Sequence, residues 1–214
     1  MASQLDSGVS GSSLRICFLT PQYPPKTGGI STYVHNLARG LAEKGHEVSV
    51  VTRQVGSIAG YRVDKGIAIY HTPHIALPMA HLFAHGFFSM KVLRKRKPDV
   101  IHVSQPGTYL PGDPHAPVVA TFHTTIDQEK AAFSFRSLYG LYVNCMWPII
   151  KRIEEDTIKK SGKIIAVSQE TAKTLIDSYP RCVGKIEVIY NALPHEWFHI
   201  ELSLIHISEP TRPY

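Results

Sequence analysis

The chain has 214 residues, and 43% of them are hydrophobic, which is typical of a globular protein and excludes a wholly disordered one. Its net charge of +6 suits contact with phosphates, anionic lipids or nucleic acid and does not choose among them. No apolar run approaches the roughly 20 residues of a membrane-spanning helix, and Met1 to Ser13 lacks the order of a signal peptide. Three widely spaced cysteines, Cys17, Cys145 and Cys182, predict neither a disulfide framework nor a zinc site and favour a cytoplasmic protein.

The N-terminal part of the chain predicts a β–α–β unit. After residues 1–13, which we expect to form a disordered tail, Arg15 to Thr20 is an almost continuously apolar run, as in parallel strands that are covered on both faces. Apolar residues then recur at helical spacing from Val34 to Ala42, and Gly45 ends this helix before a second strand at Glu47 to Thr52.

Strand-like and helical segments alternate through the rest of the chain. Further strands are expected at Ile67–His71, Val100–Val103, Val118–Phe122, Lys163–Val167 and Ile186–Tyr190, and further helices at Met79–Lys97, Phe135–Lys160 and Glu170–Ser178. This alternation predicts an α/β fold, a Rossmann-like doubly wound parallel sheet.

The turn after the first strand holds adjacent glycines, Gly28 and Gly29, just before the first helix. Ligands of parallel α/β sheets bind beyond the carboxyl ends of the strands, and glycines there let a ligand approach the backbone and the free N–H groups of the helix. A phosphate or a sugar hydroxyl fits such a turn, although a tight turn can also need glycine for its conformation alone. The spacing is neither G-x-G-x-x-G nor that of a P-loop, so the dinucleotide and P-loop interpretations lose their main support.

Several segments resemble family 4 glycosyltransferases of the GT-B fold. They are, in chain order, PPKTGGISTYVHNLARGLAEKGHEVSVVT, PDVIHVSQP, VVATFHTT, KIIAVSQETAKTL and KIEVIYNAL. The resemblance extends from about Leu14 to Phe198. It implies transfer of a sugar from a nucleotide-sugar donor to a glycan or lipid-linked acceptor hydroxyl, with retention of configuration, by two Rossmann-like domains, with no metal or other cofactor. Residues 14–200 then correspond to the N-terminal, acceptor-side domain, one half of a GT-B architecture.

The resemblance also assigns functions to particular residues. Gly28 and Gly29 would approach the donor phosphate or sugar, and His123 would be catalytic, because it matches a family position near the transferred sugar. Ser168 and Asn191 match motif positions that contact donor or acceptor, while capping or turn formation is an equal alternative for each. Ala192 replaces a glycine that is usual in the family after Asn191, which argues against close approach of a ligand there.

The C-terminal residues do not continue this pattern. Leu202 to Arg212 resembles the translation of a sequencing adapter, so we expect 201–214 to be a non-native tail, with an ordinary polar tail as the alternative. The C-terminal donor domain is then absent, and we expect the chain to be inactive alone. Glu201 and Glu209 reproduce the spacing of the family's E-x7-E pair, but Glu209 lies inside the adapter-like run, and we exclude both.

The helix expected at Met79–Lys97 carries aromatic residues and ends in a basic cluster, which predicts contact with an anionic membrane surface. A helix packed on the sheet with a solvated basic end is the alternative. The protein would then be cytoplasmic and peripheral at the inner face of the membrane. The cluster consists of Lys91, Arg94, Lys95, Arg96 and Lys97.

Other functional classes have less support. His81 and His85 share a helix face without an evident third metal ligand, and no nucleic-acid-binding module is recognisable. A nicotinamide-dependent oxidoreductase needs an acidic residue after the second strand, where Arg53 and Gln54 stand. A noncatalytic sugar- or phospholipid-binding module is the alternative that remains open.

Overall fold

The computed structural model describes residues 12–56, 60–73, 75, 80–131 and 138–192. Its strands are β1 (Arg15–Leu19), β2 (Glu47–Arg53), β3 (Gly60–Asp64), β4 (Ile67–Thr72), β5 (Val100–Gln105), β6 (Val118–Phe122), β7 (Ser161–Ala166) and β8 (Ile186–Val188). Its helices are α1 (Gly29–Glu43), α2 (Ala80–Arg96), α3 (Ile126–Ala131), α4 (Leu138–Lys160) and α5 (Gln169–Ser178), with a short 3₁₀ helix, η1 (Pro180–Cys182).

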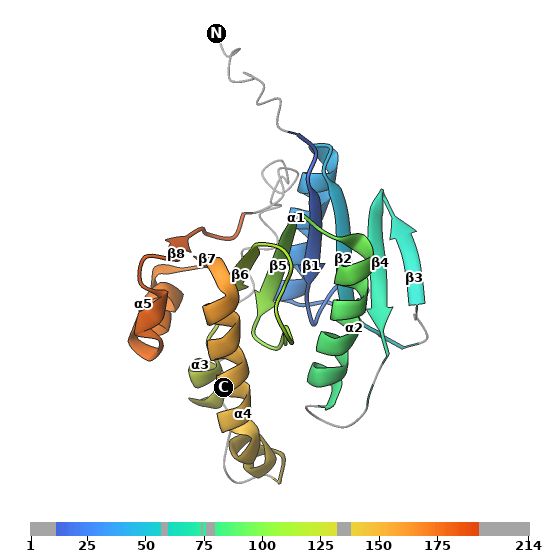
Figure 1. Cartoon of the computed structure of the whole chain (residues 1–214). Coiled ribbons are helices and arrows are strands. Elements are labelled where there is room, and N and C mark those ends of the chain that lie inside the picture. Colours follow the sequence, from blue (N-terminus) through green and yellow to red (C-terminus); the bar gives the residue numbers. More distant parts are fainter. Residues whose placement is uncertain (1–11, 57–59, 74, 76–79, 132–137, 193–214) are drawn as a thin grey trace, which may run out of the picture.

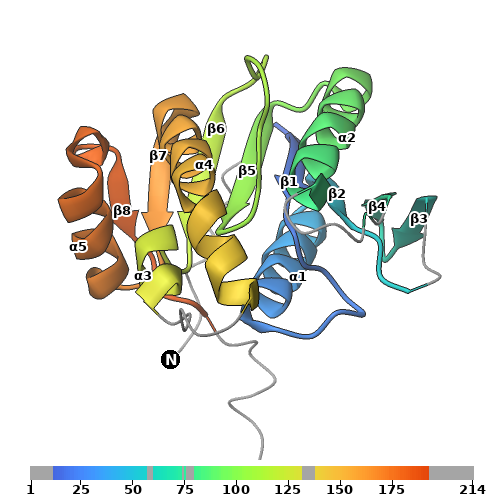
Figure 2. The same cartoon turned by 90° about the horizontal axis from the view of Figure 1, so that it is seen from below.

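All the strands form one sheet, in the order β3-β4-β2-β1-β5-β6-β7-β8. Neighbouring strands are parallel except for the antiparallel pair β3 and β4. Figure 2 shows β8 and α5 at one edge and the β3–β4 hairpin at the other. The predicted α/β class and Rossmann-like doubly wound sheet are therefore confirmed. The expectations for residues 1–11 and 193–214 lie outside the described residues.

Two apolar cores lie on opposite faces of the sheet, because side chains alternate along each strand. On one face Val34 and Ala38 of α1 pack against strand residues such as Phe18. On the other face α2, α4 and α5 cover the sheet, and Leu19 and Val103 lie in that core. Figure 1 shows α2 and α4 in front of the sheet and α1 behind it. The first strand is almost continuously apolar because side chains on both of its faces are buried under helices.

The strand order reverses between β1 and β5. From β1 the chain proceeds through α1 to β2 on one side, whereas from β5 it proceeds to β6, β7 and β8 on the other. Connections that leave in opposite directions open a crevice at the carboxyl ends of the two central strands, where ligands bind in such sheets. The segments that follow β1 and β6 therefore border the candidate site.

Besides the short η1, the sequence-based interpretation missed two elements. One is the exposed edge strand β3, which joins β4 through a tight turn in which Lys65 has φ 47° and Gly66 has φ 82°. Positive φ at both central residues is the geometry of a two-residue hairpin turn. The other is α3, a single short helix that stands before α4. The helix expected from Phe135 begins at Leu138 within the described residues.

Candidate functional site

The two glycines of the first turn occupy different environments. Gly28 is the N-cap of α1 and has φ +153°, a conformation that side chains rarely adopt, and a Cβ there would stand 2.8 Å from Oε1 of Gln22. Gly29 is the first residue of α1, and a Cβ there would meet nothing within 4 Å. Gly28 is thus required by the backbone, whereas Gly29 leaves open space beside the first N–H groups of the helix, which have no intrahelical partners.

Two arginines from the neighbouring strands hold this turn. Nε of Arg53 donates a hydrogen bond to the carbonyl oxygen of Pro21 at 2.9 Å, and Nη2 of Arg62 donates to that of Pro24 at 3.0 Å. The side chain of Tyr23, between these carbonyls, is buried in the core under α1. The turn is therefore fixed in place before any ligand arrives.

The turn also carries positive charge. Lys26 is exposed beside Gly28, and partial burial together with the nearby Arg53 guanidinium lowers the pKa of its ammonium group. A helix N-terminus attracts anions through its aligned peptide dipoles and free N–H groups. The turn and α1 thus present an anion-binding arrangement.

His123 directly follows β6, at the same end of the sheet. Its backbone N–H donates to the carbonyl oxygen of Gln105 at 3.2 Å, which extends the pairing of β5 with β6 to this residue. Its ring meets that of Tyr33 edge-on, with centroids 4.8 Å apart. The Nε2 atom is buried and has no hydrogen-bond partner among the described residues. His123 therefore has a buried ring nitrogen that no described residue satisfies.

Tyr33 connects the glycine turn to the strand that carries His123. It lies four residues after Gly29, on the same face of α1, and its hydroxyl is 3.2 Å from Oγ1 of Thr121 in β6. The same Thr121 oxygen is 2.8 Å from Nε2 of His102 in β5. The ring of His102 in turn stacks on Phe18 of β1, at 4.8 Å between centroids. These contacts bring the N-terminus of α1 and the end of β6 together.

Both histidines of this arrangement are neutral at pH 7. Burial lowers the pKa of His123 to about 4, and burial together with the nearby His123 lowers that of His102 to about 4. A neutral imidazole has one donor and one acceptor nitrogen, which suits hydrogen bonds to sugar hydroxyls. Sequence reasoning did not identify Tyr33 or His102. The polar His102 within an apolar strand, and the spacing of Tyr33 from Gly29, were the available signals.

A buried carboxyl group supports the turn that follows His123. Oε2 of Glu154 in α4 accepts a hydrogen bond from the backbone N–H of Ile126 at 3.1 Å, at the start of α3. The Glu154 side chain is almost fully buried, and this burial raises its pKa to about 7. An ion pair of 3.0 Å between Lys151 and Asp127 joins the same two helices. Helix α4 therefore holds the segment from His123 to α3 against the sheet.

Ser168 and Asn191, the other two predicted site residues, lie in different settings. Ser168 is the N-cap of α5, and its Oγ accepts a hydrogen bond from the backbone N–H of Thr171 at 3.0 Å. Asn191 is exposed and lines a hollow of about 630 Å³ between α1 and the segment that follows β8. Gly29 and Tyr33 line the same hollow. The structure thus brings Asn191 together with the glycine turn, and gives Ser168 a capping function.

The five basic residues of α2 and its C-terminal end also divide into two groups. Arg96 is 3.3 Å from Glu47 of β2 and lies over the ring of Tyr70 of β4, so it contacts the sheet. The other four, Lys91, Arg94, Lys95 and Lys97, are exposed, and Lys91 lies over the ring of the exposed Phe88 at 5.0 Å.

Two kinds of feature are absent from the described part of the chain. Within it, no group of three or more His, Cys, Asp or Glu residues is arranged to hold a metal ion. Among the same residues, no helix is long and apolar enough to cross a membrane.

Comparison with known proteins places the chain in a family of glycosyltransferases. Residues 27–197 match the model of Glycosyltransferase Family 4, and the chain belongs to this family. It is 28% identical over 204 residues to an uncharacterized glycosyltransferase of Methanocaldococcus jannaschii, covering 89% of this chain and 49% of that protein.

Two other curated relatives match shorter segments. One of the subunits of the human phosphatidylinositol N-acetylglucosaminyltransferase is 25% identical over 130 residues, which are 58% of this chain and 26% of the human protein. A GDP-mannose-dependent alpha-mannosyltransferase of Mycobacterium tuberculosis is 23% identical over 176 residues, 76% of this chain and 44% of that protein. The chain thus spans half or less of the length of these curated relatives.

Solved structures agree on the fold. Sucrose-phosphate synthase from Thermosynechococcus elongatus superposes with a TM-score of 0.57 at 14% identity, over 83% of this chain and 48% of that one. Anabaena HepE, solved in complex with UDP and glucose, superposes with a TM-score of 0.54 at 16% identity, over 84% of this chain and 45% of that one. The chain accordingly has the fold of one half of a GT-B glycosyltransferase.

Proposed function

We propose that this chain is the N-terminal, acceptor-side half of an enzyme that transfers a sugar from a nucleotide-sugar donor to an acceptor hydroxyl with retention. In this reaction the bond between the anomeric carbon and the diphosphate oxygen breaks, and a bond to the acceptor oxygen forms on the same face of the sugar. The acceptor loses its proton, and the nucleoside diphosphate leaves as an anion. The enzyme must therefore stabilise negative charge as it develops on the leaving phosphate.

The observation that carries this proposal is the convergence of the Gly28–Gly29 turn and His123 through Tyr33, in a domain of this family. The N–H groups at the start of α1 and the cation of Lys26 lie at one turn, where they would stabilise the negative charge of a departing diphosphate. His123 is neutral and has an unsatisfied ring nitrogen, and a neutral imidazole is suited to hydrogen bonds with a sugar hydroxyl. The UDP and glucose complex of HepE supports a nucleotide-sugar as donor.

Replacing Gly29 tests the proposed contact with the donor. In a full-length form of the enzyme that includes a donor domain, we expect Gly29→Val to lower kcat/KM by about a hundredfold, the loss typical when a charge-stabilising backbone donor is blocked. A Cβ at this position meets no protein atom within 4 Å, so the thermal stability should change little. If kcat/KM is unchanged, the proposed contact between this turn and the donor is wrong.

A matched control distinguishes this effect from a general cost of valine. Gly162 lies near the amino end of β7, where a Cβ would make only an ordinary contact with the carbonyl oxygen of Val118 at 3.8 Å. Gly162→Val should therefore leave transfer unchanged. If both variants lose activity equally, the loss comes from the fold and the proposed donor contact is wrong.

We infer further that these 214 residues alone do not complete transfer, because they span only about half of the Methanocaldococcus relative. Catalysis depends on groups preorganised on both sides of the departing nucleotide. The test is to mix the isolated chain with a nucleotide-sugar and a sugar-bearing acceptor and to measure the release of nucleoside diphosphate. If transfer is observed, this inference is overturned.

We propose a lipid-linked or glycan acceptor and contact with an anionic membrane surface. The name of the human relative specifies phosphatidylinositol, which supports a lipid acceptor. The exposed face of α2 carries Phe87 and Phe88 beside Lys91 and Lys95, and aromatic and basic residues together favour binding to an anionic bilayer.

The membrane proposal is tested by co-sedimentation of the chain with vesicles. We expect binding to vesicles that contain phosphatidylserine and none to vesicles of phosphatidylcholine alone. The double variant Phe87→Ser/Lys91→Gln should release the chain, because it removes both an apolar and an electrostatic contribution. Equal binding of both vesicle types would contradict the proposal.

A further inference from the structure

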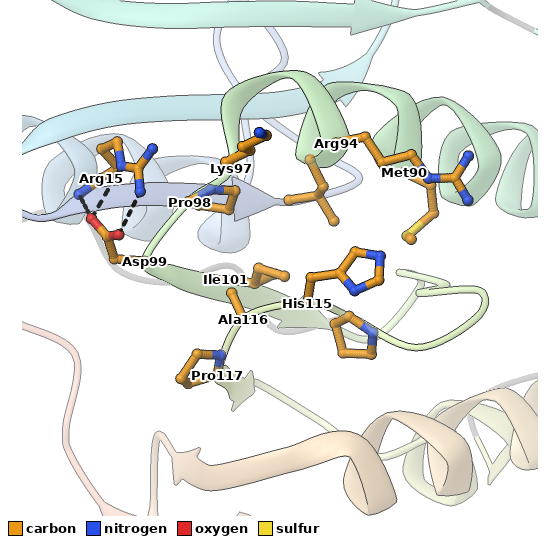
Figure 3. A pocket seen from close by; sticks show the side chains of 12 residues that line it. Arg15, Met90, Arg94, Lys97, Pro98, Asp99, Ile101, His115, Ala116 and Pro117 are labelled. Atoms are coloured by element: carbon orange, nitrogen blue, oxygen red, sulfur yellow. Dashed lines mark hydrogen bonds and ion pairs between the residues drawn. The ribbon is translucent and has the colours of Figure 1, made fainter.

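A second hollow lies at the opposite end of the sheet from the glycine turn. It is bordered by Arg15 at the start of β1, by Asp99 just before β5 and by Pro117 just before β6. These are the amino ends of strands whose carboxyl ends border the candidate transfer site. We call this hollow, of about 610 Å³, the amino-edge pocket (Figure 3); its further lining residues include Met90, Leu93, Arg94, Lys97, Ile101 and His115.

The pocket exists because the connection from β5 to β6 contains no helix, although parallel strands are usually joined through one. Residues 106–117, all of them described, form a proline-containing loop instead. This loop touches the first half of α2 so closely that a Cβ on Gly86 would lie 2.7 Å from the ring of Tyr109. Further along, Met90 and Leu93 of α2 and Lys97 just after it line the pocket.

The rim of the pocket is positively charged. Arg94 and Lys97 are both exposed, and neither side chain has an ion-pair or hydrogen-bond partner among the described residues. The one carboxylate of the lining, Asp99, is held by Arg15, whose Nη2 is 2.7 Å and whose backbone N–H is 2.8 Å from its oxygens. This pairing keeps the pKa of Asp99 below its usual value. The two free cations are therefore not balanced from within the pocket.

The floor of the pocket is apolar. Leu93 and Ile101 are buried, with 6% and 1% of their surfaces exposed, and Met90 lies beside them. In Figure 3 Arg94 and Lys97 lie along the α2 side, with Ile101 and Ala116 across from them on the sheet side. Above this floor, the half-buried Pro98, Pro114 and Ala116 and the exposed Pro117 leave apolar surface open in the pocket. An inorganic anion alone would leave that surface exposed to water, whereas an anion with an apolar chain covers it.

We propose that the amino-edge pocket binds one molecule of a lipid phosphate, with the phosphate at the rim that carries Arg94 and Lys97 and the first part of the apolar chain against Pro114, Ala116 and Pro117. This ligand is held as a single molecule in a pocket, and it is distinct from the sugar donor and acceptor, which bind at the other end of the sheet. Arg94 and Lys97 also belong to the basic cluster of the proposed membrane surface, so the experiment must separate the two.

The test is calorimetric titration of the 214-residue chain with a short-chain lipid that stays monomeric, dihexanoylphosphatidic acid. We expect saturable binding of one molecule per chain. Dihexanoylphosphatidylcholine, whose zwitterionic headgroup has no net charge, and inorganic phosphate, which has no apolar chain, should each bind at least about tenfold more weakly. Absence of saturation, or equal binding of inorganic phosphate, would overturn the proposal.

Three substitutions locate the binding. Arg94→Gln and Lys97→Asn should each weaken binding of the monomeric lipid about tenfold, because each removes one charge-assisted hydrogen bond. Asparagine is chosen for position 97 because Lys97 has φ +46°, which asparagine tolerates. Ala116→Leu should fill the pocket and abolish binding, and the far-ultraviolet circular dichroism should show an unchanged fold.

Lys95→Gln is the matched control, since Lys95 is exposed in the same helical turn, carries the same charge and does not line the pocket. A basic last turn also complements the helix dipole, and this applies to Lys95 as much as to Arg94. If Lys95→Gln weakens lipid binding as much as Arg94→Gln, the attraction is general and the pocket proposal fails. Binding of anionic vesicles without binding of the monomeric lipid would refute the pocket and leave the membrane surface in place.

Discussion

At the scale of single residues, the adjacent glycines of the first turn carry different constraints. Gly28 has a backbone conformation that other residues rarely adopt, whereas Gly29 lies in the first turn of α1 and has open space where a side chain would be. The sequence predicts that both approach a ligand, but it cannot show which of them the fold itself requires. That distinction depends on a φ angle, which the residue type alone does not reveal.

Gly28→Ala should therefore cost stability. A non-glycine residue held at φ +153° costs of the order of 1–3 kcal/mol, and the new Cβ must also displace the amide of Gln22. Urea denaturation of the chain measures this loss. Gly29→Ala is the control, and its free energy of unfolding should lie close to that of the parent chain. Equal losses in the two variants would contradict this assignment.

His123 should act without titrating near neutral pH. Because burial lowers its pKa to about 4, the neutral form predominates throughout pH 6–8, and the pH profile of kcat/KM should show no limb from this residue near 6.5. We expect His123→Ala to lower turnover of the full-length enzyme more than it lowers thermal stability. A loss of stability large enough to account for the lost turnover would make His123 a structural residue.

At the scale of elements, strands and helices with strong apolar patterns were predicted within a few residues. The runs at β1 and β6 are covered on both faces, so their sequences are almost wholly apolar. The edge strand β3 escaped prediction because its side chains alternate between exposed and half-buried positions and its turn residue Lys65 has no strong turn preference. The network of Tyr33, Thr121 and His102 joins three elements far apart in sequence, which no local pattern reports.

Two functions have been considered for Ser168: capping of α5 and contact with donor or acceptor. As the N-cap of α5 it satisfies the N–H of Thr171, and Ser168→Ala should lower the free energy of unfolding by about 1 kcal/mol. Chemical denaturation measures this value. Ser168→Asp keeps a capping oxygen and should restore the stability. If transfer in the full-length enzyme falls in the aspartate variant although stability is restored, Ser168 also contacts donor or acceptor.

At the scale of the whole molecule, the sheet has two ends with different chemistry. The carboxyl ends of the strands carry the glycine turn, neutral histidines and a helix N-terminus. The amino ends carry the amino-edge pocket with unpaired cations over an apolar floor. Because the two proposed sites share the sheet but no residue, we expect a lipid phosphate bound in the amino-edge pocket not to compete with a nucleotide-sugar bound at the glycine turn.

Buried histidines and a buried glutamate make the stability of the folded molecule depend on pH. Burial lowers the pKa of His85, His102 and His123 to about 4, so their contribution to stability is present above the ordinary value of 6.5 and is lost as the pH falls towards 4. Glu154 acts in the opposite direction. Its pKa is raised from 4.5 to about 7, so its contribution is present below pH 4.5 and is lost as the pH rises through 7.

Between pH 4.5 and 6.5 the three histidines outweigh Glu154, because unfolding takes up as many as three protons and releases one. The free energy of unfolding should therefore rise with pH, with a slope of at most about 3 kcal/mol per pH unit. Urea denaturation at several pH values measures the slope. Glu154→Gln removes the opposing group and can keep the acceptor for Ile126, so it should steepen the slope by up to about 1.4 kcal/mol per pH unit. A shallower slope in that variant would mean that Glu154 is ionised in the folded protein at these pH values, with its charge stabilised by the surrounding helices.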